Sequence, residues 1–242
     1  PVYNTEKYLS ETLNSVMGQS ITDIEIVCVD DGSTDNSLQI LEQYQKNDSR
    51  IKIIKQSNQG VVTARNTGLS QSKGDLIYLL DSDDLIDKHL LEKSYRAIIE
   101  KRGDIITTRV YLFGEANREM ILPTPNKLNM SLDNCLPNAA LFSRTLFEKS
   151  GGFDTAFDKG LEDYDFWLNM IYRQKAHIYR IPEILFFYRI KPADESRNQH
   201  QKKFFMRELK MKLSQKYPEM KRYRLLAKFC KMFFSANTKH SS

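Results

Sequence analysis

Residues 76–84 read LIYLLDSDD, an apolar run that ends in three carboxylates within four positions. The five apolar residues have the length and composition of a buried strand, so the carboxylates emerge together at its carboxyl end. In open α/β sheets, ligands bind at that edge. Crowded carboxylates repel one another unless a cation neutralises them, and divalent cations prefer oxygen ligands. By itself the cluster fits a metal-assisted site for a phosphorylated substrate and a helix N-cap equally well.

Around this stretch, strand-like and helix-like segments alternate over the first hundred residues. Strands are predicted at 24–29, 51–54 and 76–80, and helices at 6–17, 35–45, 61–69 and 87–101. This alternation predicts an α/β protein with a doubly wound, mainly parallel sheet.

The alternation ends after Gly103. The pattern then predicts strands at 105–113 and 120–122, a proline-bearing loop at 123–137, a helix at 161–172 and a strand at 184–190. From residue 200 onward it predicts two helices broken near Pro218, because proline cannot continue a helix.

Composition and cysteine usage indicate a globular protein of a reducing compartment. Hydrophobic residues make up 40% and charged residues 28%, which is ordinary for a globular chain. No apolar run approaches the roughly 20 residues that span a bilayer, and no signal peptide is visible. The three cysteines are widely spaced, which argues against a disulfide scaffold or a zinc site. We therefore expect a cytoplasmic protein, and one whose start is missing, since Pro1 is not an initiator Met.

The net charge of +5 hides an asymmetry between body and tail. Residues 201–242 contain 12 Lys or Arg against 2 Glu, while the first 200 residues contain 24 basic and 29 acidic residues. In the tail, apolar residues recur at helical spacing among the bases: Leu225, Leu226, Phe229, Cys230, Phe233 and Phe234. Residues 201–234 therefore fit either a peripheral contact with an anionic membrane or a terminal helix packed on the domain. Nucleic acid is not an expected partner, because the body is acidic and carries no nucleic-acid motif.

Two further polar segments follow predicted strands. Residues 29–35 read VDDGSTD, where Gly32 permits a tight turn and a carboxylate at the strand end can accept hydrogen bonds from a base or ribose. Alternatively, the same residues form a strand-to-helix turn that is rich in capping residues. Residues 58–68 read NQGVVTARNTG, with Arg65 in mid-helix beside two small residues. The Arg65 guanidinium can bind diphosphate oxygens through two parallel hydrogen bonds. Alternatively, Arg65 is a surface residue of an amphipathic helix.

A fourth segment, residues 160–167, reads GLEDYDFW. Glu162 and Asp163 stand at a predicted helix start, where the positive end of the helix dipole favours acids. The same dipole keeps a carboxylate ionised, which suits a general base. Capping alone remains an alternative explanation.

The order and spacing of these segments, from Pro1 to about Ser196, resemble the family 2 glycosyltransferases. The resemblance implies their GT-A fold over residues 1–198, with a nucleotide-binding half at about 1–103 and an acceptor-binding half at about 104–198. A basic helical extension is expected over residues 199–242.

By resemblance, each segment has an expected role. Pro1 and Tyr3 lie in the nucleotide-binding turn, and Asp31 contacts the base. Arg65 reaches the nucleotide, and Asp81 holds the ribose. In the DXD motif, Asp83 coordinates Mn²⁺ or Mg²⁺ on the diphosphate, which leaves Asp84 as a helix cap. In the ED motif, Asp163 is the catalytic base and Glu162 the alternative base or an acceptor ligand.

The chain departs from the family pattern in three places. The family's first strand, which precedes residues 1–4, is absent. The predicted strand 184–190 is often followed in the family by a metal-binding His, whereas this chain has Lys191. A charged Lys cannot ligate a cation, but its ammonium can bind the diphosphate. The Gln-x-x-Arg-Trp signature of processive members is also absent, which favours transfer of one sugar per encounter.

The resemblance thus implies an inverting transferase, of the hexosyl or N-acetylhexosaminyl type. It moves a sugar from a nucleotide-diphosphate donor, expected to be a UDP-sugar, to a hydroxyl of a saccharide or lipid-linked saccharide. Polysaccharide or glycoconjugate assembly is the expected process, in the cytoplasm or, if the basic tail binds a membrane, at the inner face of that membrane. Two alternatives stay open: a sugar nucleotidyltransferase, and a catalytically silent sugar-nucleotide-binding or scaffold protein.

Overall fold

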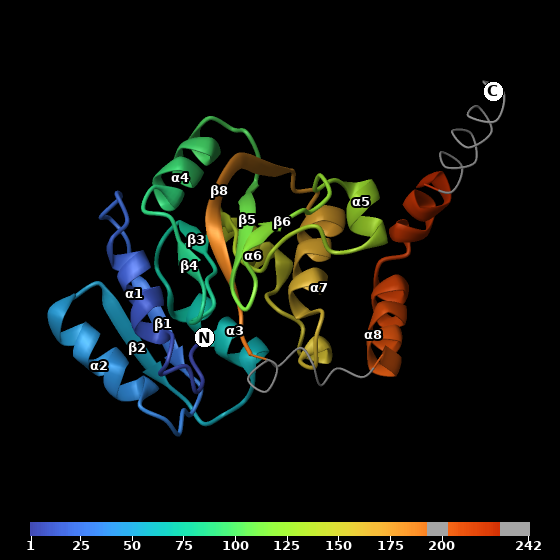
Figure 1. Cartoon of the computed structure of the whole chain (residues 1–242). Helices are drawn as coiled ribbons and strands as arrows, with labels where there is room; N and C mark the ends of the chain where they lie inside the picture. Colours follow the sequence, from blue (N-terminus) through green and yellow to red (C-terminus); the bar gives the residue numbers. More distant parts are fainter. Residues whose placement is uncertain (193–202, 228–242) are drawn as a thin grey trace.

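The computed structural model describes residues 1–192 and 203–227, and its elements alternate as an α/β protein should (Figure 1). The first part contains α1 (Leu9–Met17), β1 (Ile26–Asp30), α2 (Ser37–Asn47), β2 (Ile51–Lys55) and α3 (Val61–Gln71). Each element lies within a few residues of the predicted range. The predicted α/β class is confirmed.

The first sheet is parallel, as the alternation predicts. β1 pairs in parallel with β2, and Val2 forms a parallel bridge with Asp30. Helix α3 packs closely on this sheet at Gly68. A Cβ added to Gly68 would lie only 3.1 Å from a methyl carbon of Val29. Close packing brings the polar residues of α3 to the carboxyl ends of the strands.

The second sheet is mixed, in contrast to the mainly parallel sheet that the sequence predicts. Its strand order is β3-β7-β5-β8-β4, with β6 on β5, and only β5 and β8 pair in parallel. Its strands are β3 (Leu76–Tyr78), β4 (Leu85–Ile86), β5 (Ile105–Gly114), β6 (Arg118–Met120), β7 (Leu141–Ser143) and β8 (Ile178–Ile190). The short loop between β5 and β6 forces an antiparallel hairpin, and strands of two or three residues carry too little periodicity to show their direction.

The remaining helices lie beside the second sheet, except the last one, which lies farther from the sheet than the others (Figure 1). They are α4 (Leu90–Ile99), α5 (Lys127–Leu132), α6 (Arg144–Ser150), the 3₁₀ turn Thr155–Phe157, α7 (Glu162–Leu168) with the π turn Asn169–Arg173, and α8 (Lys203–Lys216). The prediction of a loop over residues 123–137 is wrong in part, because this segment contains α5. Asn126 caps that helix by accepting a hydrogen bond from the Asn129 backbone N–H. The prolines lie outside this helix and so do not prevent it.

The tail packs on the domain over its described length. Leu209, Leu213 and Tyr217 are buried in the core cluster that contains Phe166 and Trp167 of α7. The chain breaks near Pro218 as predicted, and a second helix runs from 219 to 227.

This second tail helix is also held to the domain. The Arg224 Nε donates to the Ser131 carbonyl at 2.6 Å, whereas Leu225 and Leu226 are exposed. The rest of the predicted amphipathic face, from residue 229 to 234, lies outside the described residues. Within the described part of the chain, no helix is long and apolar enough to cross a membrane.

Candidate active site

The acidic cluster forms the turn between β3 and β4. The Asp84 N–H donates to the Asp81 carbonyl at 3.2 Å, and β4 begins at the next residue. The expectation that Asp84 caps a helix is wrong, because α4 begins only at Leu90. Instead Asp84 is buried and accepts a hydrogen bond from the Arg189 backbone N–H at 2.8 Å. Burial and the neighbouring charges of Asp83 and Asp81 raise the pKa of Asp84 well above its usual value.

Arg65 links the DXD and ED motifs. Its Nη2 lies 2.9 Å from Asp81 Oδ1, and its Nη1 lies 2.9 Å from Glu162 Oε1. The Arg65 side chain is only 4% exposed and lies 5.4 Å from the centre of the Phe153 ring. Burial alone would raise the pKa of Asp81, but the Arg65 guanidinium lowers it. Arg65 therefore keeps Asp81 ionised and holds it near the ED motif, while its predicted contact with the diphosphate stays a prediction.

Asp163 stands at the start of α7, one residue after Glu162. The preceding residue, Leu161, adopts a left-handed conformation with φ of 61°, which costs a non-glycine residue about 1 to 2 kcal/mol. Two donors hold the Asp163 carboxylate: the Tyr164 N–H at 2.7 Å and the Asn134 Nδ2 at 3.0 Å. Burial, and then the charge of Glu162, raise the pKa of Asp163 to about 6. A carboxylate with this pKa is ionised at neutral pH and can still accept a proton.

Two asparagines complete the site, and no sequence pattern predicts them. They are Asn134 and Asn138, and both lie in the loop that follows α5. Asn134 holds Asp163, as described above. Asn138 reaches the DXD motif, where its Nδ2 lies 3.2 Å from Asp81 Oδ1. The Asn138 Oδ1 is buried without a hydrogen-bond partner. Isolated asparagines in a loop carry no periodic or spacing signal, so only the folded chain shows that they meet the acids.

Asp31 anchors a neighbouring loop. Its carboxylate accepts hydrogen bonds from the backbone N–H groups of Gln59 and Gly60, both at 2.9 Å, at the entry to α3. Gly32 is required in the turn, because its φ is 74° and a Cβ would lie 2.8 Å from the Asn58 nitrogen. Asp31 therefore has a clear structural role, and its contact with the base stays a prediction.

The first residues of the chain lie beside this turn. Tyr3 is 46% exposed and Pro1 is partly buried. The Val2 N–H donates to the Val29 carbonyl at 2.8 Å, which places both predicted nucleotide residues at the carboxyl edge of the first sheet. Their contact with a nucleotide also stays a prediction.

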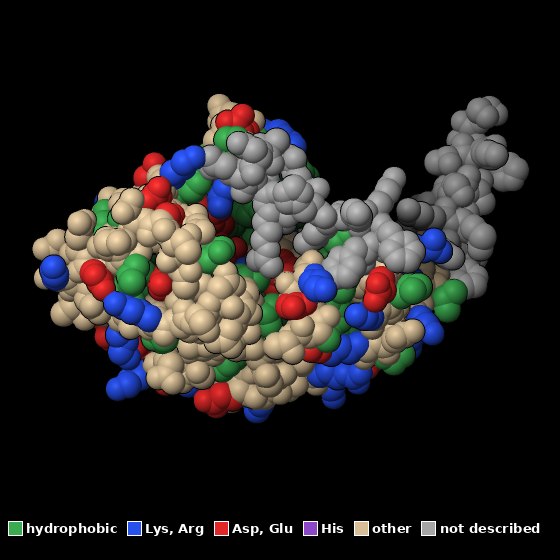
Figure 2. All heavy atoms as spheres, turned by 90° about the horizontal axis from the view of Figure 1, so that it is seen from below, with side chains coloured by type: hydrophobic (Ala, Val, Ile, Leu, Met, Phe, Trp, Pro, Cys, Tyr) green, Lys and Arg blue, Asp and Glu red, His purple; other side chains and the backbone are tan. Residues whose placement is uncertain are grey.

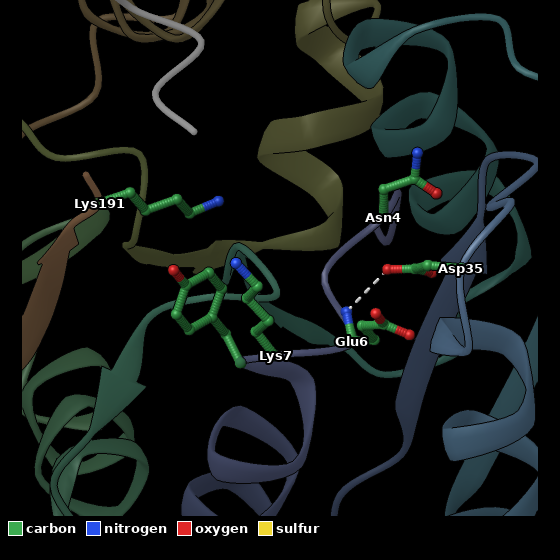
Figure 3. A pocket seen from close by; sticks show the side chains of 6 residues that line it. Asn4, Glu6, Lys7, Asp35 and Lys191 are labelled. Carbon is green, nitrogen blue, oxygen red and sulfur yellow. Dashed lines mark hydrogen bonds between the residues drawn. The ribbon is translucent and has the colours of Figure 1, made fainter. Parts of the chain in front are cut away.

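Lys191 follows β8 and reaches the DXD motif. Its Nζ lies 2.5 Å from Asp83 Oδ2 and 5.3 Å from the centre of the Tyr8 ring. Lys191 lines a pocket of about 270 Å³ together with Asn4, Glu6, Lys7, Tyr8 and Asp35, and its side chain extends into that pocket (Figure 3). The molecular surface seen from below is hollowed near its centre, with acidic side chains visible in the hollow (Figure 2).

The carboxylates of the cluster do not form a ready shell for a divalent cation. Asp81 is held by Arg65, Asp84 by a backbone N–H, and Asp83 by Lys191. Among residues 1–192 and 203–227, no three His, Cys, Asp or Glu side chains are grouped so as to hold a metal ion. Asp83 is the one predicted ligand, and its charge is already neutralised.

Comparison with known proteins identifies the family. The sequence profile described as "Glycosyl transferase family 2" matches residues 1–178. This chain belongs to glycosyl transferase family 2. The glycosyltransferase GlyG of Streptococcus pneumoniae is a relative of this family 2 chain, with 38% identity over 118 residues. That match covers 48% of this chain and 39% of GlyG, so the chain spans well under half the length of that relative.

Solved structures confirm the GT-A fold of this family 2 chain. It is similar to S. aureus TarS in complex with UDP, with 26% identity, a TM-score of 0.63, and coverage of 80% of this chain and 60% of the TarS chain. The mannosyltransferase PcManGT from Pyrobaculum calidifontis, in complex with GDP-Man and Mn²⁺, shares the fold at 18% identity and a TM-score of 0.63. That match covers 80% of this chain and 56% of PcManGT.

Proposed function

We propose that this family 2 chain transfers one sugar from a UDP-sugar to an acceptor hydroxyl with inversion, and that Asp163 is the catalytic base. The observation that carries the proposal is the setting of Asp163, with a pKa of about 6 beside the ED partner Glu162. An effective general base has a pKa near the working pH. The likeness to TarS, whose structure contains UDP, supports a uridine donor.

In the proposed reaction, Asp163 removes the proton from the acceptor hydroxyl as its oxygen attacks the anomeric carbon. The bond between that carbon and the diphosphate oxygen breaks, and the electron pair leaves with the nucleoside diphosphate. The proton stays on Asp163 and later passes to solvent. Attack opposite to the leaving group inverts the anomeric centre.

Glu162 is the weaker candidate for the base. Its carboxylate is paired with Arg65 at 2.9 Å and is 15% exposed, so proton uptake would break a nearly buried ion pair. In this proposal Glu162 and Arg65 position the two motifs, and Asp163 touches the acceptor.

The test compares Asp163→Asn with the wild-type chain. UDP release from a panel of UDP-sugars should fall at least about a hundredfold, because general base catalysis contributes roughly 10² to 10⁴-fold. UDP binding, measured by calorimetry, should be unchanged. Near-normal UDP release by Asp163→Asn would remove Asp163 from this role, and a wild-type chain that binds UDP but never releases it from a donor would favour the silent-binding alternative.

We also infer that the acceptor is a saccharide or lipid-linked saccharide met at the cytoplasmic face of a membrane. Leu225 is 57% and Leu226 is 48% exposed on a helix that also carries Lys221 and Arg222, which suits an anionic surface. The full chain should float with vesicles containing anionic lipid, and a double Glu variant at Leu225 and Leu226 should not. Equal flotation of both proteins, or of neither, would contradict this contact.

A further inference from the structure

The negative charges of the DXD motif are paired with basic side chains of the protein, Arg65 and Lys191. Of these two, Lys191 faces the pocket. Arg65, which neutralises Asp81, is 4% exposed, whereas the Lys191 side chain is 22% exposed and the Asp83 side chain 20%. Lys191 lines the pocket and extends into it, and Arg65 is not part of the lining, so a ligand that enters the pocket meets the Lys191 ammonium (Figure 3).

The backbone next to Lys191 is firmly fixed. The Arg189 N–H donates to Asp84, and the Arg189 Nε donates to the Asp83 carbonyl at 2.7 Å. The Arg189 guanidinium also bonds Glu11 at 2.8 Å and lies 4.7 Å from the centre of the Tyr8 ring. Because these hydrogen bonds fix the end of β8 against the DXD turn, the Lys191 ammonium is held next to the Asp83 carboxylate.

An ammonium at this position can do part of the work of a metal. It has three N–H donors, and one bond to Asp83 leaves donors for phosphate oxygens. It also brings a positive charge to the diphosphate, as a bound cation would. A divalent cation would first have to displace the ammonium from Asp83 and would then be repelled by it at close range.

We infer, on the basis of the proposed function, that Lys191 binds the donor diphosphate in place of a divalent cation, so that nucleotide binding by this chain needs no metal. Asp83 orients the ammonium, and the diphosphate is held between Lys191 and the pocket wall that carries Asn4 and Lys7. Lys7 and Lys191 offset the two carboxylates that also line the pocket, those of Glu6 and Asp35.

Calorimetric titration of the full chain with UDP, and in parallel with GDP, tests this inference. In EDTA the wild-type chain should bind UDP, and added Mn²⁺ should change the Kd by less than about threefold. Lys191→Met should weaken binding in EDTA by about 10- to 100-fold, the value of one charge-assisted hydrogen bond. Lys149→Met, which changes an exposed Lys on α6, is the matched control and should bind as the wild type does.

Lys191→His gives the complementary result, because imidazole is a metal ligand. This variant should bind UDP weakly in EDTA and regain affinity with Mn²⁺, and electron paramagnetic resonance should show Mn²⁺ immobilised only in the variant. A wild-type chain that binds nucleotide with Mn²⁺ but not in EDTA would overturn the inference and leave the proposed function intact. A wild-type chain that binds neither nucleotide under either condition would contradict the proposed function and this inference with it.

Discussion

Replacing Asp163 by Asn should stabilise the protein while it removes activity. The folded protein holds this carboxyl at a pKa of about 6, against an ordinary value of 3.8. For an acid, a raised folded-state pKa means that ionisation is harder in the folded chain than in the unfolded one. The resulting penalty is present above pH 6, shrinks as the pH falls, and vanishes below the unfolded pKa.

The size of this effect follows from the two pKa values. At pH 8 the difference corresponds to about 3 kcal/mol at most, since one pKa unit is about 1.4 kcal/mol, and at pH 5 to about half of that. Asp163 is partly exposed, so solvent screening reduces the gain to about 1 to 3 kcal/mol at pH 8. Asn keeps a carbonyl that can accept the Tyr164 N–H, so the helix start is retained.

Urea unfolding at pH 8 and pH 5 measures the gain in free energy of unfolding. Asp163→Asn should be more stable than the wild type, by about twice as much at pH 8 as at pH 5. Asp23→Asn, at an exposed position, is the control and should change stability by less than about 0.5 kcal/mol at both pH values. An equal gain at both pH values, or a loss at pH 8, would refute the argument that burial of a charged base destabilises the fold.

Three other substitutions test the surrounding contacts. Tyr217→Phe should lower the free energy of unfolding by about 1.5 to 3 kcal/mol, because the fully buried hydroxyl donates to the Asp165 carboxylate at 2.9 Å; a loss under about 0.5 kcal/mol in urea unfolding would contradict this. Arg65→Met should cost about 3 kcal/mol by leaving two partly buried acids unpaired. It should also move the acid limb of the pH–rate profile above pH 6, because the Arg65 charge lowers the pKa of Asp163; an unmoved limb would argue against this coupling. Asn134→Ala should reduce turnover about tenfold, because it removes the 3.0 Å hydrogen bond to Asp163. UDP affinity, measured by calorimetry, should be unchanged. A change in UDP affinity alone would instead show that Asn134 binds the donor.

The sequence alone determined the order of elements and the placement of most motif residues. Apolar periodicity is local, so the runs that become β1, β2 and β3, and the helices between them, lie close to their predicted bounds. Asp31 directly follows β1 of the first sheet, whereas Asp81 follows β3 of the second, mixed sheet, so the assignment of both to one site rests on the order of the motifs along the chain and stays a prediction.

The tertiary structure decided which of these groups contact one another. Arg65 and Glu162 are 97 residues apart, and their ion pair depends on how α7 docks against α3, which no local pattern encodes. The same holds for Asn134 and Asn138, for the buried Asp84, and for α8, whose apolar face finds a core rather than solvent. Strand direction in the second sheet is likewise a property of the whole sheet. Propensity and periodicity act over a few residues, whereas burial and the pairing of charges depend on chain segments that become neighbours only on folding.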